Sequence, residues 1–521
     1  MSLNHSPTYD LVIIGTGSGG GTLAQRVAPS NKRILIIERG DYIPREKENW
    51  DVNEVVVKGR YRTTEVWYDK DNQPFSPFTH YVVGGNSKVY GAASFRLRES
   101  DFQEQQHETG VSPGWPLTYA DFAPYYDQAE ALFSVHGQRR ADPTEPPTTA
   151  PYPFGPITPE PFAEELYQNI HKAGLKPFPI PMAVRLPQDN TNQPDAPVVL
   201  GNFDGFPDPT EAKADSHVTG IRAALQHPNV TLMTNAVVTK LITSHTGQRI
   251  TAVEIQHNGE TKIFHADTVV LAAGAINSAA LLLRSANEQH PNGLANSSGQ
   301  VGRNYMSHIN GCQIAYTPDK LNTTFFQKYF CIGDYYEATG ENPHPLGEIQ
   351  LMGKNDPPTV VGLAADFLPN RDADWLLSHS IDFWLTAEDL PDPDNRVTLT
   401  PNGDIQLTYH RERNNVAAFE ALKQKLKDLF ATLGTIDPAL KTVHWAGYDL
   451  GISGVSHQCG TLRFGTDPAT SVLDIHCKAH ELDNLFVADA SFFPSSGAYN
   501  PSLTTAANAL RVGDYLLANV L

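Results

Sequence analysis

Cysteine, positive charge and long apolar runs are all scarce in this sequence of 521 residues. Its four cysteines, Cys312, Cys331, Cys459 and Cys477, show no CxxC spacing and predict neither a disulfide scaffold nor a zinc site. Lys and Arg number 39 against 58 Asp and Glu, and the net charge of −19 argues against nucleic acid and anionic membrane surfaces as partners. The acidic residues show no clustered spacing, so we expect no metal.

No uninterrupted apolar stretch reaches the roughly 20 residues of a membrane span. The longest, 266–283, is interrupted by polar residues and Gly274. The stretch 1–9 lacks the charged and apolar regions of a secretory signal. We therefore expect a cytoplasmic protein without a membrane span. The length predicts two or three domains, and 39 Gly with 39 Pro predict many turns and ordered loops.

The first forty residues predict a strand, a helix and a second strand. A buried-strand pattern over 9–14 stops at a glycine cluster over 15–20, helical composition follows over 22–28, and a second apolar run covers 33–37. This order is typical of a dinucleotide-binding βαβ unit.

Each of the four residues that define the fingerprint has a physical role. Gly15 permits the tight turn, Gly17 lets the backbone approach a diphosphate, and Gly20 packs the helix against the strand. Glu38, at the end of the second strand, can accept hydrogen bonds from ribose hydroxyls and would repel a 2′-phosphate. The pattern favours FAD or NAD over NADP and leaves these two open.

The rest of the chain mixes short strands with a few helices. Strands are expected at 230–233, 237–242, 252–255, 268–273, 396–400, 405–409 and 484–488, and helices at 278–285, 415–433 and 502–520. The region 312–450 is typical of an α+β domain. The N-terminal βαβ unit and the mixed strands and helices that follow predict the α/β fold class.

Six further segments occur in a characteristic order. They are 83–87 (VGGNS), 274–278 (GAINS), 301–304 (VGRN), 394–399 (DNRVTL), 457–461 (HQCGT) and 500–504 (NPSLT). Together with the N-terminal fingerprint, these segments resemble the glucose-methanol-choline (GMC) oxidoreductases, in particular their pyranose-oxidase-like, sugar-oxidising branch. The resemblance implies a Rossmann-type FAD-binding domain, formed by 1–110, 216–310 and 451–521. An α+β substrate domain, formed by 111–215 and 311–450, would place an antiparallel sheet over the flavin.

The resemblance also assigns cofactor contacts. The ADP half of FAD would be held by Gly15, Gly17, Ser18, Gly20, Glu38, Arg39 and Val238; the diphosphate and flavin would lie along Gly84, Gly85, Asn86, Ser87, Tyr90, Gly91, Ala92, Asp489, Ala490, Asn500 and Pro501. Tyr90 replaces an Asn that many members have beside the flavin. Val89 stands where pyranose oxidases carry the histidine that links to flavin, so the FAD is expected to be non-covalent.

His457 and Asn500 match the catalytic pair of the family in its His-Asn variant. An imidazole can take the proton of an alcohol while hydride leaves the neighbouring carbon for flavin N5. The Asn amide can donate to the developing alkoxide. Phe383, Trp384 and Tyr499 are the expected substrate walls, whereas His308 is expected to be a buried structural histidine.

The sequence thus predicts an FAD-dependent oxidoreductase acting on the hydroxyl of a sugar, glycoside or polyol, with oxygen or a quinone as electron acceptor. Sterol, aliphatic or choline-type alcohols are the alternative substrates. A flavoprotein that only carries electrons and an NAD-dependent dehydrogenase are alternatives of other classes. The particular alcohol, the carbon oxidised and the oligomeric state stay open.

Overall fold

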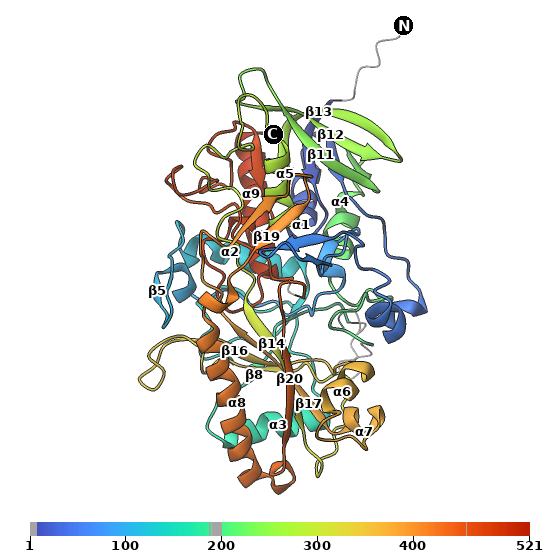
Figure 1. The fold of residues 1–521 in the computed structure, drawn as a ribbon, viewed down its shortest axis with the longest axis vertical. Coiled ribbons are helices and arrows are strands. Elements are labelled where there is room, and N and C mark those ends of the chain that lie inside the picture. The colour runs from blue at the N-terminus through green and yellow to red at the C-terminus, as the bar shows by residue number, and fades with distance from the viewer. Residues whose placement is uncertain (1–7, 187–188, 190–200, 455) are drawn as a thin grey trace.

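The computed structural model describes residues 8–186, 189, 201–454 and 456–521. Residues 1–7, on which most of the prediction about a secretory signal rests, lie outside the described residues, as do parts of the predicted substrate segment 111–215. In Figure 1 one half of the molecule contains the N-terminal strand and the C-terminal helix, and the other half contains a second sheet flanked by helices. Within the described residues, no helix combines the length and apolar character needed to cross a membrane.

The first half is built on a seven-stranded sheet in the order β10-β2-β1-β13-β12-β11, with β21 also paired to β13. The bounds are β1 Thr8–Ile14, β2 Ile34–Ile37, β10 Val230–Met233, β11 Ala236–Thr243, β12 Ile250–His257, β13 Glu260–Leu271 and β21 Leu485–Val487. The central pairings are parallel and the β11–β12–β13 pairings are antiparallel. β2 is buried along its whole length, as expected of a strand covered on both faces.

Helices cover this sheet and bring the two ends of the chain together. They are α1 Ser18–Val27, α2 Tyr119–Leu132, α4 Arg222–Ala224, α5 Ala275–Arg284 and α9 Ser502–Asn519. α9 packs against both α1 and α2. The hydroxyls of Ser18 and Ser502 lie 3.0 Å apart, and Arg26 pairs with Asp514 at 2.5 Å. The first helix of the chain is therefore held by the last.

The second half contains a six-stranded antiparallel sheet in the order β20-β14-β17-β16-β15-β8. Its strands are β8 Phe178–Pro179, β14 Ile309–Tyr316, β15 Phe330–Ile332, β16 Glu348–Leu351, β17 Ser380–Ala387 and β20 His444–Asp449. α3 (Pro161–Lys172) and α8 (Val416–Ile436) share an apolar core with one face. α6 (Pro357–Ala364) and α7 (Ala373–Ser378) pack together beside this sheet (Figure 1). Part of the other face packs against α6 and α7.

A four-stranded sheet crosses the division into two domains that the sequence predicts. It contains β18 Arg396–Leu399, β19 Ile405–Thr408, β3 Trp67–Asp69 and β4 Pro74–Phe75. β19 pairs in parallel with β3, through Gln406 and Tyr68. The predicted segments 1–110 and 311–450 thus share one sheet, because short strands far apart in sequence pair here. Two further pairs are β5 (Gln105–Gln106) with β6 (Val111–Ser112), and β7 (Val135–His136) with β9 (Met182–Ala183).

Candidate active site

One cavity of about 1010 Å³ extends from the β1–α1 turn to the face of the six-stranded sheet. Its volume lies at the upper end of the roughly 300–1,000 Å³ of small-molecule sites, which suits a dinucleotide together with a substrate. The predicted residues that line it are Gly15, Gly17, Ser18, Glu38, Arg39, Gly85, Asn86, Ser87, Tyr90, Gly91, Ala92, Val238, Trp384, His457, Asp489, Ala490, Asn500 and Pro501. The fold thus brings together segments from the whole length of the chain.

The β1–α1 turn offers a site for an anion. Gly15 has φ +104°, and a Cβ there would collide with the carbonyl of Ala272, so the turn requires glycine. A Cβ on Gly17 would meet no atom within 4 Å, because this position faces the cavity. No side chain caps the N-terminus of α1, and its first turn has no acidic residue. The amides and positive end of the helix dipole are therefore available to a phosphate.

Glu38 ends β2 at the same part of the cavity. Its carboxylate accepts hydrogen bonds from the Thr16 hydroxyl at 2.5 Å and from the Gly40 amide at 3.0 Å, and burial raises its pKa. The Thr16 hydroxyl also accepts from the amide of Gly84, at 2.9 Å. This contact joins the fingerprint turn to the second glycine cluster. Gly20 and Gly84, also predicted to bind the cofactor, are not among the residues that line the cavity; Gly20 packs closely on the Gly15 carbonyl and Gly84 on the Lys88 side chain.

Asp489 fixes the start of α5 next to the fingerprint. Its Oδ2 accepts from the Gly274 amide at 3.0 Å and from the Ser278 hydroxyl at 2.5 Å, and its Oδ1 accepts from the amide of Ser491 at 3.0 Å. Burial raises the pKa of this carboxyl. Asp489 lines the cavity as predicted, while both of its oxygens also hold the surrounding backbone in place.

Together these features fit FAD. The uncapped helix and the open cradle at Gly17 suit a diphosphate, and Glu38 suits a ribose. The cavity then continues past Tyr90–Ala92 toward His457 and Asn500, leaving room for the flavin and a substrate. The Tyr90 hydroxyl donates to the Ala214 carbonyl at 2.8 Å, so it is already occupied within the protein.

His457 is held between two side chains in the cavity wall. Its Nδ1 lies 3.0 Å from Nδ1 of His308, and its Nε2 lies 3.4 Å from Nδ2 of Asn500. His308 donates its Nε2 hydrogen to the Ser496 carbonyl at 3.3 Å, and burial lowers the pKa of His308 to about 4. Nδ1 of neutral His308 is therefore bare and can only accept. The hydrogen between the rings belongs to His457, whose Nε2 carries the lone pair.

The protonation state of His457 suits a base. Burial lowers the pKa of His457 well below its usual value, and His308 and Lys328 contribute further. The ring is neutral at physiological pH, and its tautomer places the basic nitrogen toward Asn500. A hydroxyl entering between the two side chains would meet this basic nitrogen and an amide donor.

Gln350 determines which end of the Asn500 amide faces His457. The Gln350 amide donates to Oδ1 of Asn500 and to Oε1 of Glu348, both at 2.8 Å. Because Oδ1 of Asn500 is occupied, Nδ2 must face the histidine. Burial raises the pKa of Glu348 to about 8, so this carboxyl is protonated at neutral pH. The hydrogen bonds of the site thus run in one direction, from Gln350 through Asn500, His457 and His308 to the carbonyl of Ser496.

A partly buried ion pair lies beside Gly91. Nζ of Lys328 is 2.8 Å from Oδ1 of Asp204, and the Gly353 amide donates to Oδ2 at 3.0 Å. A Cβ on Gly91 would collide with Oδ1 of Asp204, so the backbone passes close to the pair. In the described part of the chain, every acidic side chain that lines the cavity has a hydrogen-bonding partner within the protein: Glu38, Asp204, Asp356 and Asp489.

Two of the three predicted substrate walls lie elsewhere. Phe383 is fully buried on the other face of β17, where its ring meets Phe430 edge-on at 5.7 Å. Tyr499 is also fully buried, and its ring stacks on those of Phe95 at 4.4 Å and Tyr336 at 4.2 Å. Of the three, only Trp384 lines the cavity. Alternation along β17 separates the two neighbouring aromatic residues.

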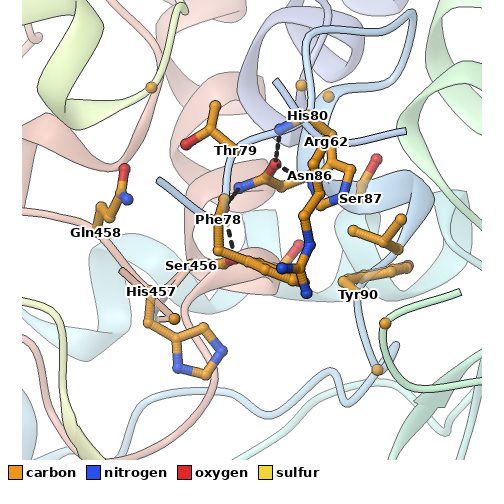
Figure 2. A pocket seen from close by; sticks show the side chains of 18 of the residues that line it. Arg62, Phe78, Thr79, His80, Asn86, Ser87, Tyr90, Ser456, His457 and Gln458 are labelled. Atoms are coloured by element: carbon orange, nitrogen blue, oxygen red, sulfur yellow. Dashed lines mark hydrogen bonds between the residues drawn. The ribbon is translucent and has the colours of Figure 1, made fainter. Parts of the chain in front are cut away.

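Several residues of the cavity were not predicted. Figure 2 shows Arg62, Phe78 and His80 beside Asn86, within the cavity that His457 also lines. The carbonyl of Phe78 accepts from Asn86 at 3.5 Å and from the Ser456 hydroxyl at 3.3 Å, which ties the second glycine cluster to the residue before His457. The segment 41–80 is rich in proline and aromatic residues, and this composition is the sequence signal that could have indicated this wall. His308 is buried as predicted, but its contact with His457 was not foreseen.

Family models described as GMC oxidoreductase match residues 9–310 and 391–509. Paromamine 6′-oxidase of Streptomyces fradiae is 28% identical and aligns with 96% of this chain and 90% of its own length. The fructose dehydrogenase large subunit of Gluconobacter japonicus is 26% identical, over 99% of this chain and 98% of that protein.

Solved structures share the fold at lower identity. Pyridoxine 4-oxidase from Mesorbium loti superposes with a TM-score of 0.63 at 18% identity, covering 98% of this chain and 99% of that one. A variant of formate oxidase from Aspergillus oryzae superposes with a TM-score of 0.68 at 16% identity, covering 98% of each. These likenesses support the arrangement of a Rossmann-type half and a half with an antiparallel sheet.

Proposed function

The chain belongs to the GMC oxidoreductase family, and from this premise we propose that its substrate is the hydroxyl group of an uncharged sugar, glycoside or polyol. Membership makes it an FAD-dependent oxidoreductase of CH–OH groups. Relatives named as a paromamine oxidase and a fructose dehydrogenase support a sugar or sugar-like substrate. The proposal includes that the enzyme belongs to the pyranose-oxidase-like, sugar-oxidising branch of the family.

The observation that carries the proposal is the pairing of Nε2 of His457 with Nδ2 of Asn500 in the cavity wall. FAD, when bound, supplies the acceptor for the hydride that leaves the carbinol carbon. His457 takes the hydroxyl proton at Nε2. This nitrogen carries the lone pair because Nδ1 of His308 accepts the hydrogen on Nδ1 of His457. Asn500 donates from Nδ2 to the substrate oxygen as negative charge develops there.

The charges of the cavity favour a neutral substrate over a choline-type cation. A quaternary ammonium loses its hydration on burial, and a carboxylate without another partner replaces that hydration best. The described cavity carboxylates are already bonded within the protein, and Asp204 is neutralised by Lys328. A hydroxylated, uncharged molecule needs no such counter-charge.

Four finer points belong to the same proposal. FAD is held without a covalent bond, which the inert side chain of Val89 in the cavity wall supports. Oxygen or a quinone reoxidises the bound FAD.

All four cysteines are free and buried, which supports a cytoplasmic location. The domains are 1–110, 216–310 and 451–521 for FAD, and 111–215 and 311–450 for substrate.

Anaerobic bleaching of the flavin tests this function. Sugars and polyols should bleach the holoenzyme, whereas choline and a sterol should not. His457→Ala and Asn500→Ala should each slow bleaching by about 100-fold or more, whereas His265→Ala, which changes an exposed histidine on β13, should have no effect. Bleaching by a sterol alone would overturn the sugar assignment. Survival of alcohol-dependent bleaching in both cavity variants would overturn the catalytic role of the pair, whereas bleaching of the wild type by no alcohol would favour an electron carrier.

A covalent link is tested separately. Acid precipitation of the holoenzyme should release the yellow chromophore into the supernatant, and colour retained in the pellet would contradict non-covalent binding.

A further inference from the structure

The peptide group between Ser496 and Gly497 connects the catalytic histidine to a buried carboxylate. Its carbonyl accepts the hydrogen on Nε2 of His308, at 3.3 Å, and its N–H donates to Oε1 of Glu388, at 3.2 Å. His308 in turn accepts from His457. Glu388, which directly follows β17 and is not among the residues that line the cavity, is thus joined to the base through one peptide group and one imidazole ring.

The loop that contains this peptide group is held in one conformation. The hydroxyl of Ser496 donates to the carbonyl of Asp389 at 3.0 Å and accepts from its amide at 3.2 Å. Gly497 has φ +59°, and a Cβ there would lie 2.9 Å from the side chain of Leu97, so the loop requires glycine. In a planar trans peptide group the C=O and the N–H point in opposite directions. The group therefore faces His308 on one side and the carboxylate on the other.

Glu388 is held as a negative charge. It is 5% exposed, and its carboxylate also accepts from Nε2 of His107 at 3.0 Å and from the Ser112 hydroxyl at 2.6 Å. The Asn415 amide donates to Nδ1 of His107 at 3.1 Å, so Nε2 carries the hydrogen. Burial opposes ionisation of Glu388, but the hydrogen bonds from His107, Ser112 and the Gly497 amide outweigh it and lower its pKa.

The two histidines have no carboxylate in direct contact. Among the residues that the structure describes, none places a carboxylate oxygen on His457 or His308. His457 nevertheless becomes an imidazolium when it takes the hydroxyl proton. A carboxylate that supports a catalytic imidazole fixes its tautomer and stabilises this cation.

The peptide group can transmit such support from Glu388. Its N–H donates to an anion, and because the group is delocalised, electron density moves toward the Ser496 carbonyl oxygen. That oxygen then accepts a stronger hydrogen bond from His308. Burial lowers the pKa of His308, and the negative charge of Glu388 opposes this effect.

We propose that Glu388 is a positioning residue for the reaction, which acts through the Ser496–Gly497 peptide group and His308 to keep the tautomer of His457 and to stabilise its imidazolium. No proton moves along this connection: the hydroxyl proton stays on Nε2 of His457, and each other hydrogen stays on its own nitrogen. The inference rests on the part of the proposed function in which His457 is the base, and it holds for any alcohol substrate.

Other titratable groups surround Glu388. They are His107, His308, Asp101, Asp389 and Cys459. Burial raises the pKa of Asp101 and that of Asp389 to about 7, and it raises the pKa of Cys459 well above its usual value. Below about pH 6 these three groups are therefore uncharged, and Glu388 supplies the negative charge of the group.

Glu388→Gln removes this charge at nearly constant size. With an alcohol that reduces the wild-type flavin, kcat should fall about tenfold with little change in KM, because His457 becomes a weaker base. For the same reason the acid limb of the pH profile should move about one unit lower. Asp389→Asn is the matched control. It removes a neighbouring carboxyl that is uncharged in the acid range, so the limb should stay in place. A lower kcat without a shift, or an equal shift in both variants, would contradict the proposal.

A double variant shows whether the effect passes through His308. In His308→Leu the Ser496 carbonyl loses its donor, so the further change Glu388→Gln should lower kcat by less than about twofold. If the two losses multiply instead, Glu388 acts on the structure in general and the proposal is overturned. Should Glu388→Gln not fold, Glu388→Asp replaces it in each comparison of kcat, because its carboxylate is withdrawn from the Gly497 amide by one CH2 group.

Nuclear magnetic resonance tests the connection without turnover. In holoenzyme with isotopically labelled histidine, the hydrogen on Nε2 of His308 is identified by its loss in His308→Leu. Its resonance should move upfield in Glu388→Gln or Glu388→Asp, because the hydrogen bond to Ser496 weakens, and should stay in place in Asp389→Asn. An unmoved resonance would overturn the proposal even in an active enzyme. Flavin reduction by no alcohol would overturn the proposed function, and the resonance would still decide whether Glu388 supports His308.

Discussion

At the scale of single residues, the direction of each hydrogen bond around His457 follows from its neighbours. The backbone carbonyl of Ser496 can only accept from Nε2 of His308, so Nδ1 of His308 can only accept from His457. On the other side, Gln350 donates to Asn500, so Asn500 directs its amide hydrogens toward His457. The base and the donor are thus oriented before a substrate arrives, and neither has to reorganise during the reaction.

The role of His308 can be tested with two variants. His308→Leu should lower kcat about 10- to 100-fold with little change in KM, because His457 can then adopt the tautomer that places its hydrogen on Nε2. His308→Gln should recover most of this loss, since its amide oxygen can accept from Nδ1 of His457. The measurement is the rate of anaerobic flavin reduction at saturating substrate, across pH. Equal losses in both variants, or in KM alone, would contradict a positioning role.

Glu348 should make stability depend on pH. Burial raises its pKa from 4.5 to about 8, so the folded protein keeps a proton that the unfolded chain releases. This contribution is fully present below pH 4.5 and is lost as the pH rises through about 8. Between these limits the free energy of unfolding should fall by on the order of 4 kcal/mol.

Glu348→Gln mimics the protonated side chain and should flatten that part of the profile. Thermal unfolding of both proteins between pH 5 and pH 8 measures the effect, with the wild type losing stability relative to the variant as the pH rises. Parallel profiles would show that Glu348 does not titrate in this window.

At the scale of elements, the β1–α1 turn contains two glycines that are needed for different reasons. Gly15 needs its positive φ and has no room for a Cβ, whereas Gly17 has φ −63° and faces open space. One glycine is therefore required by the fold and the other by the ligand.

Substitution should separate these uses. Gly15→Ala should yield little folded protein, because the methyl group would collide with the carbonyl of Ala272 in the adjoining strand. Gly17→Ala should fold with an apoprotein melting temperature close to that of the wild type, but bind FAD at least about tenfold more weakly, because the methyl group enters the diphosphate cradle. Calorimetric titration of the apoproteins with FAD provides the measurement. An unchanged FAD affinity in Gly17→Ala would place the diphosphate elsewhere.

The sequence predicted elements with a strong local pattern and missed relations that depend on packing. The unit of β1, α1 and β2 follows from apolar runs around a glycine turn, and α8 follows from helical periodicity. In β17 every residue but Trp384 is buried, so hydrophobicity could not tell which of Phe383 and Trp384 faces the cavity. The contact between His308 and His457 joins positions 149 residues apart and left no local signal.

At the scale of the whole molecule, the net charge of −19 affects how fast charged substrates and electron acceptors approach the protein. A neutral sugar or quinone is neither attracted nor repelled at long range. An anion is repelled until salt screens the surface.

Ionic strength should reveal this difference. With ferricyanide as the artificial acceptor, the rate of flavin reoxidation should rise several-fold between about 0.01 M and 0.5 M salt, because the Debye length falls from about 30 Å to a few ångström. With neutral benzoquinone, the rate should stay constant. Stopped-flow measurement of both acceptors on the same reduced enzyme provides the control. A similar rise with benzoquinone would indicate a salt effect on the protein itself.

The packing of α1 against α9 bears on how the protein is made. The cradle for the cofactor opens at Gly17, but the ribosome adds the helix that holds α1 and the side chain of Asn500 long after it has made α1. Until 500–519 have emerged, the nascent chain has a nucleotide-binding turn without its supporting helix. FAD can therefore be captured stably only after synthesis has passed α9, and a chain that stops before it would expose the apolar surface of α1 to chaperones and proteases.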